Sequence, residues 1–231
     1  MTTDLADNIQ RVQERIRAAA LRAGRSPAEI TLVPVTKTVP PATIRAAYDL
    51  GLRVFGENRV QEAQAKVAAL SDLPDLHWHL VGHLQRNKAK VALGLFEVIH
   101  SVDSLRLAET LSRLATEAGR MTPVLLEVNV TGEATKFGFA PAELRDAVPA
   151  ITALPGLSIW GLMTVAPLVA DPETVRPVFR QLRLWRDELA RSHPAHPWSH
   201  LSMGMTDDFE VAIEEGATMV RIGRAIFAGC L

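Results

Sequence analysis

The sequence predicts an α/β protein, a single (β/α)8 barrel of the TIM type with one extra helix at its N-terminus. Short apolar runs alternate with helical patterns about eight times, and an amphipathic helix precedes the first run. The 231 residues are 48% hydrophobic and 22% charged, and no repeat or linker divides them, so we expect residues 1–231 to form one domain. The alternative is a three-layer doubly wound fold, because a strand count taken from one sequence can be off by one or two.

The elements follow from the pattern in chain order. Apolar residues recur every three or four positions from Asp4 to Ala23, which predicts a helix that stops at Gly24. Residues 30–36 are almost continuously apolar, as in a strand buried on both faces, and this run ends at Lys37. A helix opens at residues 40–41 and closes at Gly51. Further strands are predicted at 53–55, 78–81, 98–100, 124–130, 158–163, 201–203 and 219–222, and further helices at 104–118, 141–154 and 172–191.

Charge and cysteine content narrow the functional classes. The formal net charge is -1, so no global basic surface marks a nucleic-acid or anionic-membrane partner, and an anionic ligand must be held locally. The one cysteine, Cys230, can form neither an intrachain disulfide nor a cysteine-based metal cage. The N-terminus lacks the apolar core of a secretory signal, and no apolar stretch reaches membrane-spanning length. We therefore expect a cytoplasmic protein.

In a parallel barrel the functional residues lie where strands end and the following loops begin. Lys37 is the strongest candidate, because a lysine at the end of a buried strand is expected to lose hydration. Loss of hydration favours the neutral amine, which can attack a carbonyl. The alternative is a lysine that extends to solvent from a strand tip. A zinc site is suggested by three nearby histidines, His77, His79 and His83. No carboxylate partner pattern accompanies them, so we expect no metal site.

The last two strand ends predict a phosphate site. Gly223, followed by Arg224, begins a turn into a short helix, and Ser202 can add a hydroxyl donor. Arg221 should face the same side as Gly223 by strand alternation, near the phosphate or a cofactor ring. The alternatives are a simple turn and a salt-bridged barrel arginine. An amine and a phosphate site at one face describe a pocket for a phosphorylated aldehyde.

At this point the motifs are similar to successive signatures of the pyridoxal phosphate homeostasis protein family. They cover nearly the whole chain in order, at 35–38 (VTKT), 55–62 (FGENRVQE), 78–88 (WHLVGHLQRNK), 100–104 (HSVDS), 127–130 (EVNV), 136–138 (KFG), 161–164 (GLMT), 201–208 (LSMGMTDD) and 221–223 (RIG).

The resemblance implies a barrel like the N-terminal domain of alanine racemase, with pyridoxal 5'-phosphate (PLP) held as an aldimine on Lys37. It also implies that Ser202, Gly223 and Arg224 hold the phosphate, that Arg221 faces the pyridine nitrogen and that Asn58 lies near the ring. Two departures matter. Many members have a second lysine where this chain has Val39, and many have a small hydroxyl residue at position 224, so only the backbone amide of Arg224 is carried over.

The family's role is intracellular PLP homeostasis, which implies a carrier without an established turnover reaction and without catalytic residues. The expected partners are PLP and apo forms of PLP-dependent enzymes, and the expected state is a monomer. One alternative is a PLP-dependent, racemase-like enzyme with weak activity. Racemisation needs a second acid or base opposite the lysine, whereas the only tyrosine, Tyr48, falls in the helix after the first strand, and we expect no second domain. The other alternative is a PLP-free aldolase-type barrel, which a visible absorbance spectrum would distinguish.

Overall fold

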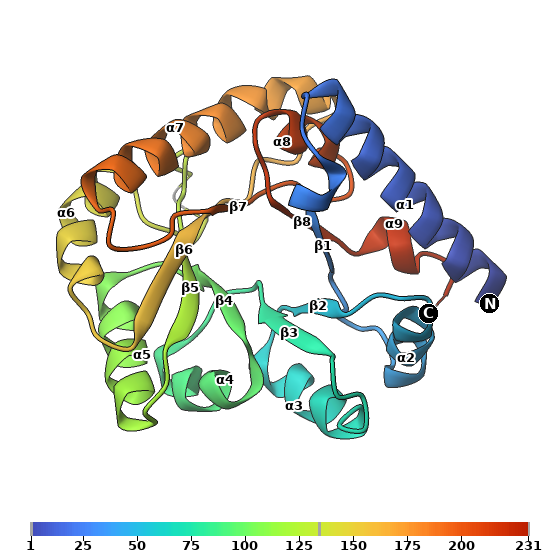
Figure 1. Ribbon diagram of the computed structural model, residues 1–231, viewed down its shortest axis with the longest axis horizontal. Helices are drawn as coiled ribbons and strands as arrows, with labels where there is room; N and C mark the ends of the chain where they lie inside the picture. The colour runs from blue at the N-terminus through green and yellow to red at the C-terminus, as the bar shows by residue number, and fades with distance from the viewer. Residues whose placement is uncertain (1, 134, 231) are drawn as a thin grey trace.

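The computed structural model describes residues 2–133 and 135–230, and its centre is a ring of eight parallel strands (Figure 1). Neighbouring strands pair in the order β1-β8-β7-β6-β5-β4-β3-β2, and a single bridge between Val35 and Gly56 joins β1 to β2. This confirms the predicted (β/α)8 barrel. The strands are β1 (Thr31–Pro34), β2 (Val54–Glu57), β3 (His77–Leu80), β4 (Val98–Val102), β5 (Thr122–Glu127), β6 (Leu157–Met163), β7 (His200–Ser202) and β8 (Met219–Ile222).

The helices surround the strands, and the extra N-terminal helix is present as predicted (Figure 1). None of the helices in the described part of the chain combines the length and apolarity needed to cross a membrane. They are α1 (Thr2–Arg22), α2 (Pro41–Asp49), α3 (Val60–Ala69), α4 (Ala89–Leu95), α5 (Leu105–Glu117), α6 (Pro141–Thr152), α7 (Arg176–Ser192), α8 (Phe209–Glu214) and α9 (Arg224–Phe227), with 3-10 turns η1 (Pro27–Glu29), η2 (Arg86–Lys88) and η3 (Pro172–Val175).

Helix α1 lies along α8 and α9 and buries one apolar stripe against them (Figure 1). Leu5, Ile9 and Val12 are each less than 5% exposed, as the three- and four-residue spacing predicts. The Asn8 side-chain amide donates to the Ile226 carbonyl at 3.0 Å. This bond ties α1 to the short helix that follows β8.

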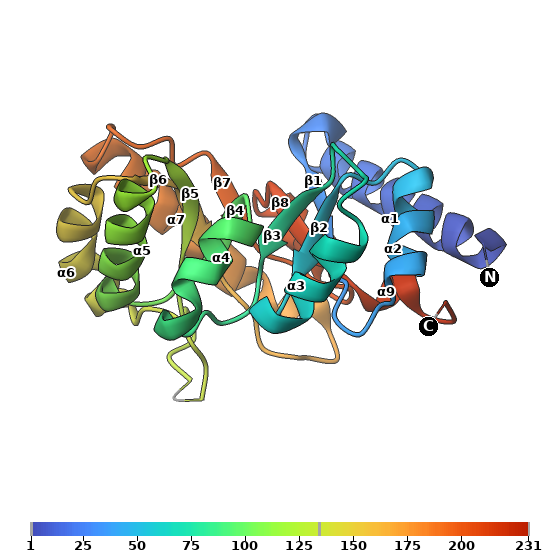
Figure 2. The same ribbon diagram turned by 90° about the horizontal axis from the view of Figure 1, so that it is seen from below.

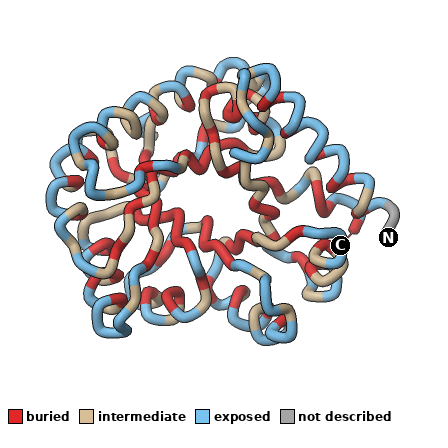
Figure 3. Tube along the Cα trace, viewed as in Figure 1, coloured by how far each residue is buried: buried red, intermediate tan, exposed pale blue. Residues whose placement is uncertain are grey.

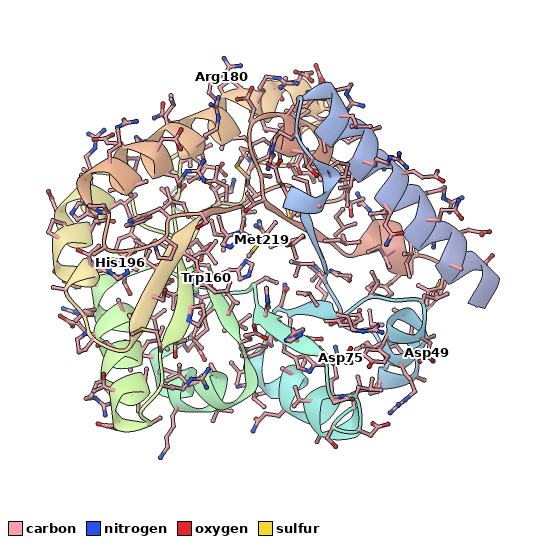
Figure 4. All side chains as sticks on the ribbon, viewed as in Figure 1. Asp49, Asp75, Trp160, Arg180, His196 and Met219 are labelled. Carbon is pink, nitrogen blue, oxygen red and sulfur yellow. The ribbon has the colours of Figure 1, made fainter. Side chains whose placement is uncertain are left out.

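Buried residues concentrate on the strands and on the helix faces turned toward them (Figure 3). Inside the ring, apolar side chains such as Val33 and Met219 form small clusters, and Met219 lies near the centre in Figure 4. The interior also holds polar side chains, which is unusual for a barrel filled mainly by branched apolar residues. The buried polar residues on the strands at this level include His79, His100, Glu127, Ser202 and Arg221.

Strand register brings the end of β1 beside the end of β8. Pro34 pairs with Ile222, and the Val35 amide donates to the Ile222 carbonyl at 3.0 Å. The segment that carries Lys37 therefore leaves the sheet next to the turn at Gly223. The loops after β5 and β6 project from one end of the barrel (Figure 2).

Candidate cofactor-binding cleft

An open cleft of about 590 Å³ lies at the carboxyl ends of the strands, and five of the six predicted site residues line it. Its volume falls in the usual range for small-molecule sites. The predicted residues that line it are Lys37, Asn58, Arg221, Gly223 and Arg224. Ser202 is fully buried in the barrel interior and is not part of the cleft wall.

Lys37 is exposed, so the expectation that its strand end would strip its hydration is wrong. The reason is that β1 ends at Pro34 and only the Val35 bridge follows, so Lys37 already lies in a turn. The next residue, Thr38, has φ of 63° in the left-handed region, an uncommon and strained backbone for a β-branched residue. Lys37 thus reaches the cleft from a tight turn.

A buried ion pair holds the start of this turn. The Lys66 ammonium donates to the Glu57 carboxylate and to the Thr36 carbonyl, both at 2.6 Å. The Thr36 hydroxyl donates to the same Glu57 oxygen at 2.5 Å. Since Thr36 immediately precedes Lys37, helix α3 and strand β2 together fix the base of the lysine turn.

The turn after β8 is built from close backbone contacts. A Cβ atom at Gly223 would lie 3.0 Å from the Val35 carbonyl oxygen, so a larger residue would push apart the ends of β1 and β8. The Arg224 guanidinium donates to Asp207 at 2.6 Å, and both residues line the cleft. The Arg224 guanidinium is thus already paired, and the sequence interpretation that its backbone amide serves the phosphate stays a prediction.

Thr206 also lines the cleft, and the Ala225 amide approaches its hydroxyl at 3.5 Å. The sequence interpretation assigned the hydroxyl at this end to Ser202 and did not select Thr206. The signal that could have found it is its place in the loop directly after β7, which faces the turn at Gly223.

The opposite wall of the cleft comes from the loops after β2 and β3. Gly82 lies so close to the Asn58 backbone that an added Cβ would clash with the Asn58 carbonyl oxygen, so the two loops are packed tightly against each other. His83 stacks on Phe137 with ring centroids 3.8 Å apart, and its Nδ1 lies 2.9 Å from Asp103. Phe137 is more than half exposed, so an aromatic pair forms part of the rim.

Arg221 lies at the buried end of the cleft and is 4% exposed. Its guanidinium donates to the Ser202 hydroxyl oxygen at 2.7 Å and to the Thr164 carbonyl at 2.8 Å. Burial lowers the pKa of Arg221 to about 10, while nearby Glu127 and Asp208 act in the opposite direction. Arg221 therefore stays cationic at neutral pH and has further N–H groups to offer a ligand.

Glu127 is a cleft residue that the sequence interpretation missed. It ends β5, is 7% exposed, and its Oε2 has no hydrogen-bond partner among the described residues. Burial raises the pKa of Glu127 to about 7, Asp103 raises it further, and Arg221 opposes the change. A buried carboxyl that titrates near neutral pH is a common feature of functional sites.

The histidines of β3 do not assemble a metal site. His77 is at the surface with Nδ1 2.5 Å from Glu97, whereas His79 is inside the barrel against His100. Within residues 2–133 and 135–230, no group of three metal-ligating side chains has the required placement.

Residues 3–230 match the family model described as alanine racemase, N-terminal domain. The pyridoxal phosphate homeostasis protein of Aquifex aeolicus is 49% identical over 221 residues, covering 96% of both chains. The one from Escherichia coli K12 is 42% identical over 229 residues, covering 97% of this chain and 96% of that one.

Solved structures are similar to this chain in fold. The structure of PipY from Synechococcus elongatus with PLP bound superposes with a TM-score of 0.84 at 45% identity, covering 94% of this chain and all of that one. Alanine racemase of Clostridium difficile, at 15% identity and TM-score 0.72, shares the fold; the match covers 96% of this chain and 56% of the racemase. The chain belongs to the alanine racemase N-terminal domain family and, within it, to the pyridoxal phosphate homeostasis proteins.

Proposed function

We propose that this chain binds PLP in the cleft and serves intracellular PLP homeostasis, with Lys37 as the residue that links covalently to the cofactor. The observation that carries the proposal is that one cleft brings together an exposed lysine, a backbone turn at Gly223 and a buried cationic arginine. PLP has an aldehyde, a phosphate and a pyridine nitrogen, and these three features suit its three groups. The naming of the relatives and the PLP in the PipY structure support the same ligand.

The residues fit the cofactor group by group. The Gly223 turn and the Arg224 amide would receive the phosphate, and the Thr206 hydroxyl lies at the same end. The Lys37 amine would add to the aldehyde carbon, with water leaving. Arg221 would meet the pyridine nitrogen and Asn58 would lie beside the ring. Ser202 would act behind Arg221, because its hydroxyl oxygen accepts from that guanidinium.

Arg221 also bears on whether the cofactor turns over. PLP supplies an electron sink that is strongest when its ring nitrogen is protonated. Because Arg221 keeps its own proton at neutral pH, it would donate to that nitrogen and leave it unprotonated. This favours holding and handing on PLP over amino-acid chemistry. We extend the proposal to a cytoplasmic monomer, one domain over residues 1–231, that delivers PLP to apo enzymes.

The test of the assignment is reduction with borohydride, which fixes PLP on its lysine. Lys37→Ala should lose the visible absorbance band and the reduced adduct, whereas wild-type protein should carry the adduct on the Lys37 peptide. Lys88→Ala is the matched control, because Lys88 lines the adjoining hollow with Asn58 and His83. An adduct that persists on another lysine of Lys37→Ala would overturn the assignment.

One observation favours a second candidate, a weak racemase-like activity. Glu127 lies in the cleft with its pKa raised to about 7, so it can give or take a proton at neutral pH. Tyr48, by contrast, lies in α2 with its hydroxyl bonded to Asp75 at the surface. If D-amino acids form from L-amino acids at enzymatic rates and Glu127→Gln abolishes their formation, the second candidate replaces the first.

A further inference from the structure

Four buried polar side chains inside the barrel form one hydrogen-bonded chain that begins at Arg221. The Arg221 guanidinium donates to the Ser202 oxygen at 2.7 Å, and Ser202 Oγ lies 2.8 Å from His100 Nδ1. His100 Nε2 lies 3.0 Å from His79 Nδ1. The four residues belong to β8, β7, β4 and β3, and each is at most 5% exposed. The chain therefore crosses the interior from the cleft to the far side of the ring.

The hydrogen positions in this chain follow from what each group can do. Arginine only donates, so Ser202 Oγ accepts from Arg221 and its own hydrogen needs an acceptor. His100 Nδ1 is the acceptor within reach, which places the His100 proton on Nε2, where it is donated to His79 Nδ1. The opposite direction would leave the buried Ser202 hydroxyl hydrogen without an acceptor, a cost that buried groups rarely bear.

Both imidazoles are held neutral, as this direction requires. Burial lowers the pKa of His79 to about 3, with His77 and His200 as further causes. Burial likewise holds the pKa of His100 well below its ordinary value; the Arg221 charge acts in the same direction, as a proton added to His79 or His200 would. Neither ring competes with Arg221 for positive charge at neutral pH.

This hydrogen-bonded chain matters because its Ser202 oxygen is one of the two acceptors that hold the Arg221 guanidinium. The other acceptor is the Thr164 carbonyl at 2.8 Å. Two acceptors at fixed positions define the plane of the group, and the remaining N–H groups are left for the cleft. A serine that donates to His100 is also a stronger acceptor for Arg221, since hydrogen bonds in series polarise one another.

We propose that His100 is a positioning residue for Arg221, held with its proton on Nε2 so that the Ser202 hydroxyl points away from the guanidinium. The proposal deepens the proposed function, on which it rests where Arg221 is taken to meet the cofactor ring. His79 completes the chain by accepting the His100 proton.

The first experiment uses the PLP-free protein and does not depend on cofactor binding. Imidazole 15N–1H correlation spectra should show His79 and His100 as neutral rings protonated at Nε2, and the Arg221 Nη protons should exchange slowly. Ser202→Ala should speed exchange of the Arg221 protons and release His100 from a single tautomer. A His100 ring protonated at Nδ1 in the wild-type protein would overturn the proposal.

The second experiment measures PLP affinity in matched variants. His100→Leu removes the acceptor for Ser202 and should weaken PLP binding about tenfold, the effect of orphaning one buried hydroxyl. His100→Asn has an amide oxygen near the Nδ1 position and should restore most of the affinity. His200→Leu is the control, because His200 is also on β7 but bonds Thr218 outside the chain.

The outcomes distinguish the role of His100 from the proposed binding of PLP. If His100→Leu and His100→Asn lose affinity equally while both stay folded by urea titration, His100 acts only by filling space and the proposal fails. If wild-type protein takes up no PLP, the proposed function fails, whereas the tautomers and Arg221 exchange in the free protein still decide the hydrogen-bonded chain.

Discussion

Replacing Glu127 by glutamine should change how stability depends on pH. Burial, Asp103 and the partial opposition of Arg221 place the pKa of Glu127 at about 7 in the folded protein, against 4.5 for an ordinary glutamate. The unfolded chain therefore ionises first, so this residue costs nothing below pH 4.5 and lowers stability progressively as pH rises to about 7. At about 1.4 kcal/mol for each pH unit between the two pKa values, the full cost is about 3 kcal/mol.

The assay is urea unfolding of the PLP-free protein, followed by tryptophan fluorescence, at several pH values between about 4.5 and about 8. The free-energy difference between Glu127→Gln and wild type should grow in favour of the variant by about 3 kcal/mol across this range. Glu109→Gln, a change of an exposed carboxyl in α5, is the control and should show no such growth. A difference that stays constant with pH would refute the reasoning, because Glu127 would then ionise like an ordinary surface glutamate.

Three further results are expected. Lys66→Met should destabilise the protein by about 3–5 kcal/mol in urea unfolding, because Glu57 would be left buried without its cation; a loss below about 1 kcal/mol would contradict a structural role for the pair. Gly223→Ala should weaken PLP binding about tenfold, because its Cβ presses on the Val35 carbonyl and moves the turn; unchanged affinity in the folded variant would place the phosphate elsewhere. The PLP-loaded protein should pass PLP to an added apo enzyme and convert L-amino acids far more slowly than about one per second; faster conversion without transfer would favour the racemase-like alternative.

Periodicity predicted the barrel well because a parallel barrel needs buried strands and amphipathic helices in strict alternation. The run before Lys37 and the helix from Asp4 to Ala23 both correspond to observed elements, β1 and α1. One helix starts well inside its predicted range. The predicted segment 172–191 begins with the 3-10 turn η3 and becomes α-helical at Arg176.

Strand ends were less predictable, and this bears on two residues of the site. The apolar alternation of 124–130 extends past the observed end of β5, so Glu127 was taken as mid-strand although it ends the strand and faces the cleft. The sequence interpretation assigned Ser202 to the phosphate, and in the structure its hydroxyl oxygen accepts from Arg221 inside the barrel. Some inward-facing residues line the cleft and others lie deeper in the barrel. The difference depends on strand tilt and stagger, and the hydrophobic periodicity of one sequence does not determine these.

Burying Arg221 and Glu127 in the barrel costs desolvation energy, and a bound ligand is able to offset it. Burial moves the pKa of Arg221 down and that of Glu127 up, and both changes are those of charged groups deprived of solvent. Apolar residues of similar size at these two positions would avoid this desolvation cost. Val33 and Leu125 are examples of buried apolar residues elsewhere in the ring. A molecule that accepts from Arg221 and bonds the open Glu127 oxygen would relieve both groups at once. An anion in the same cleft would also favour the protonated form of Glu127. PLP binding at pH values above 7 should therefore take up a proton, and Glu127→Gln should abolish that uptake.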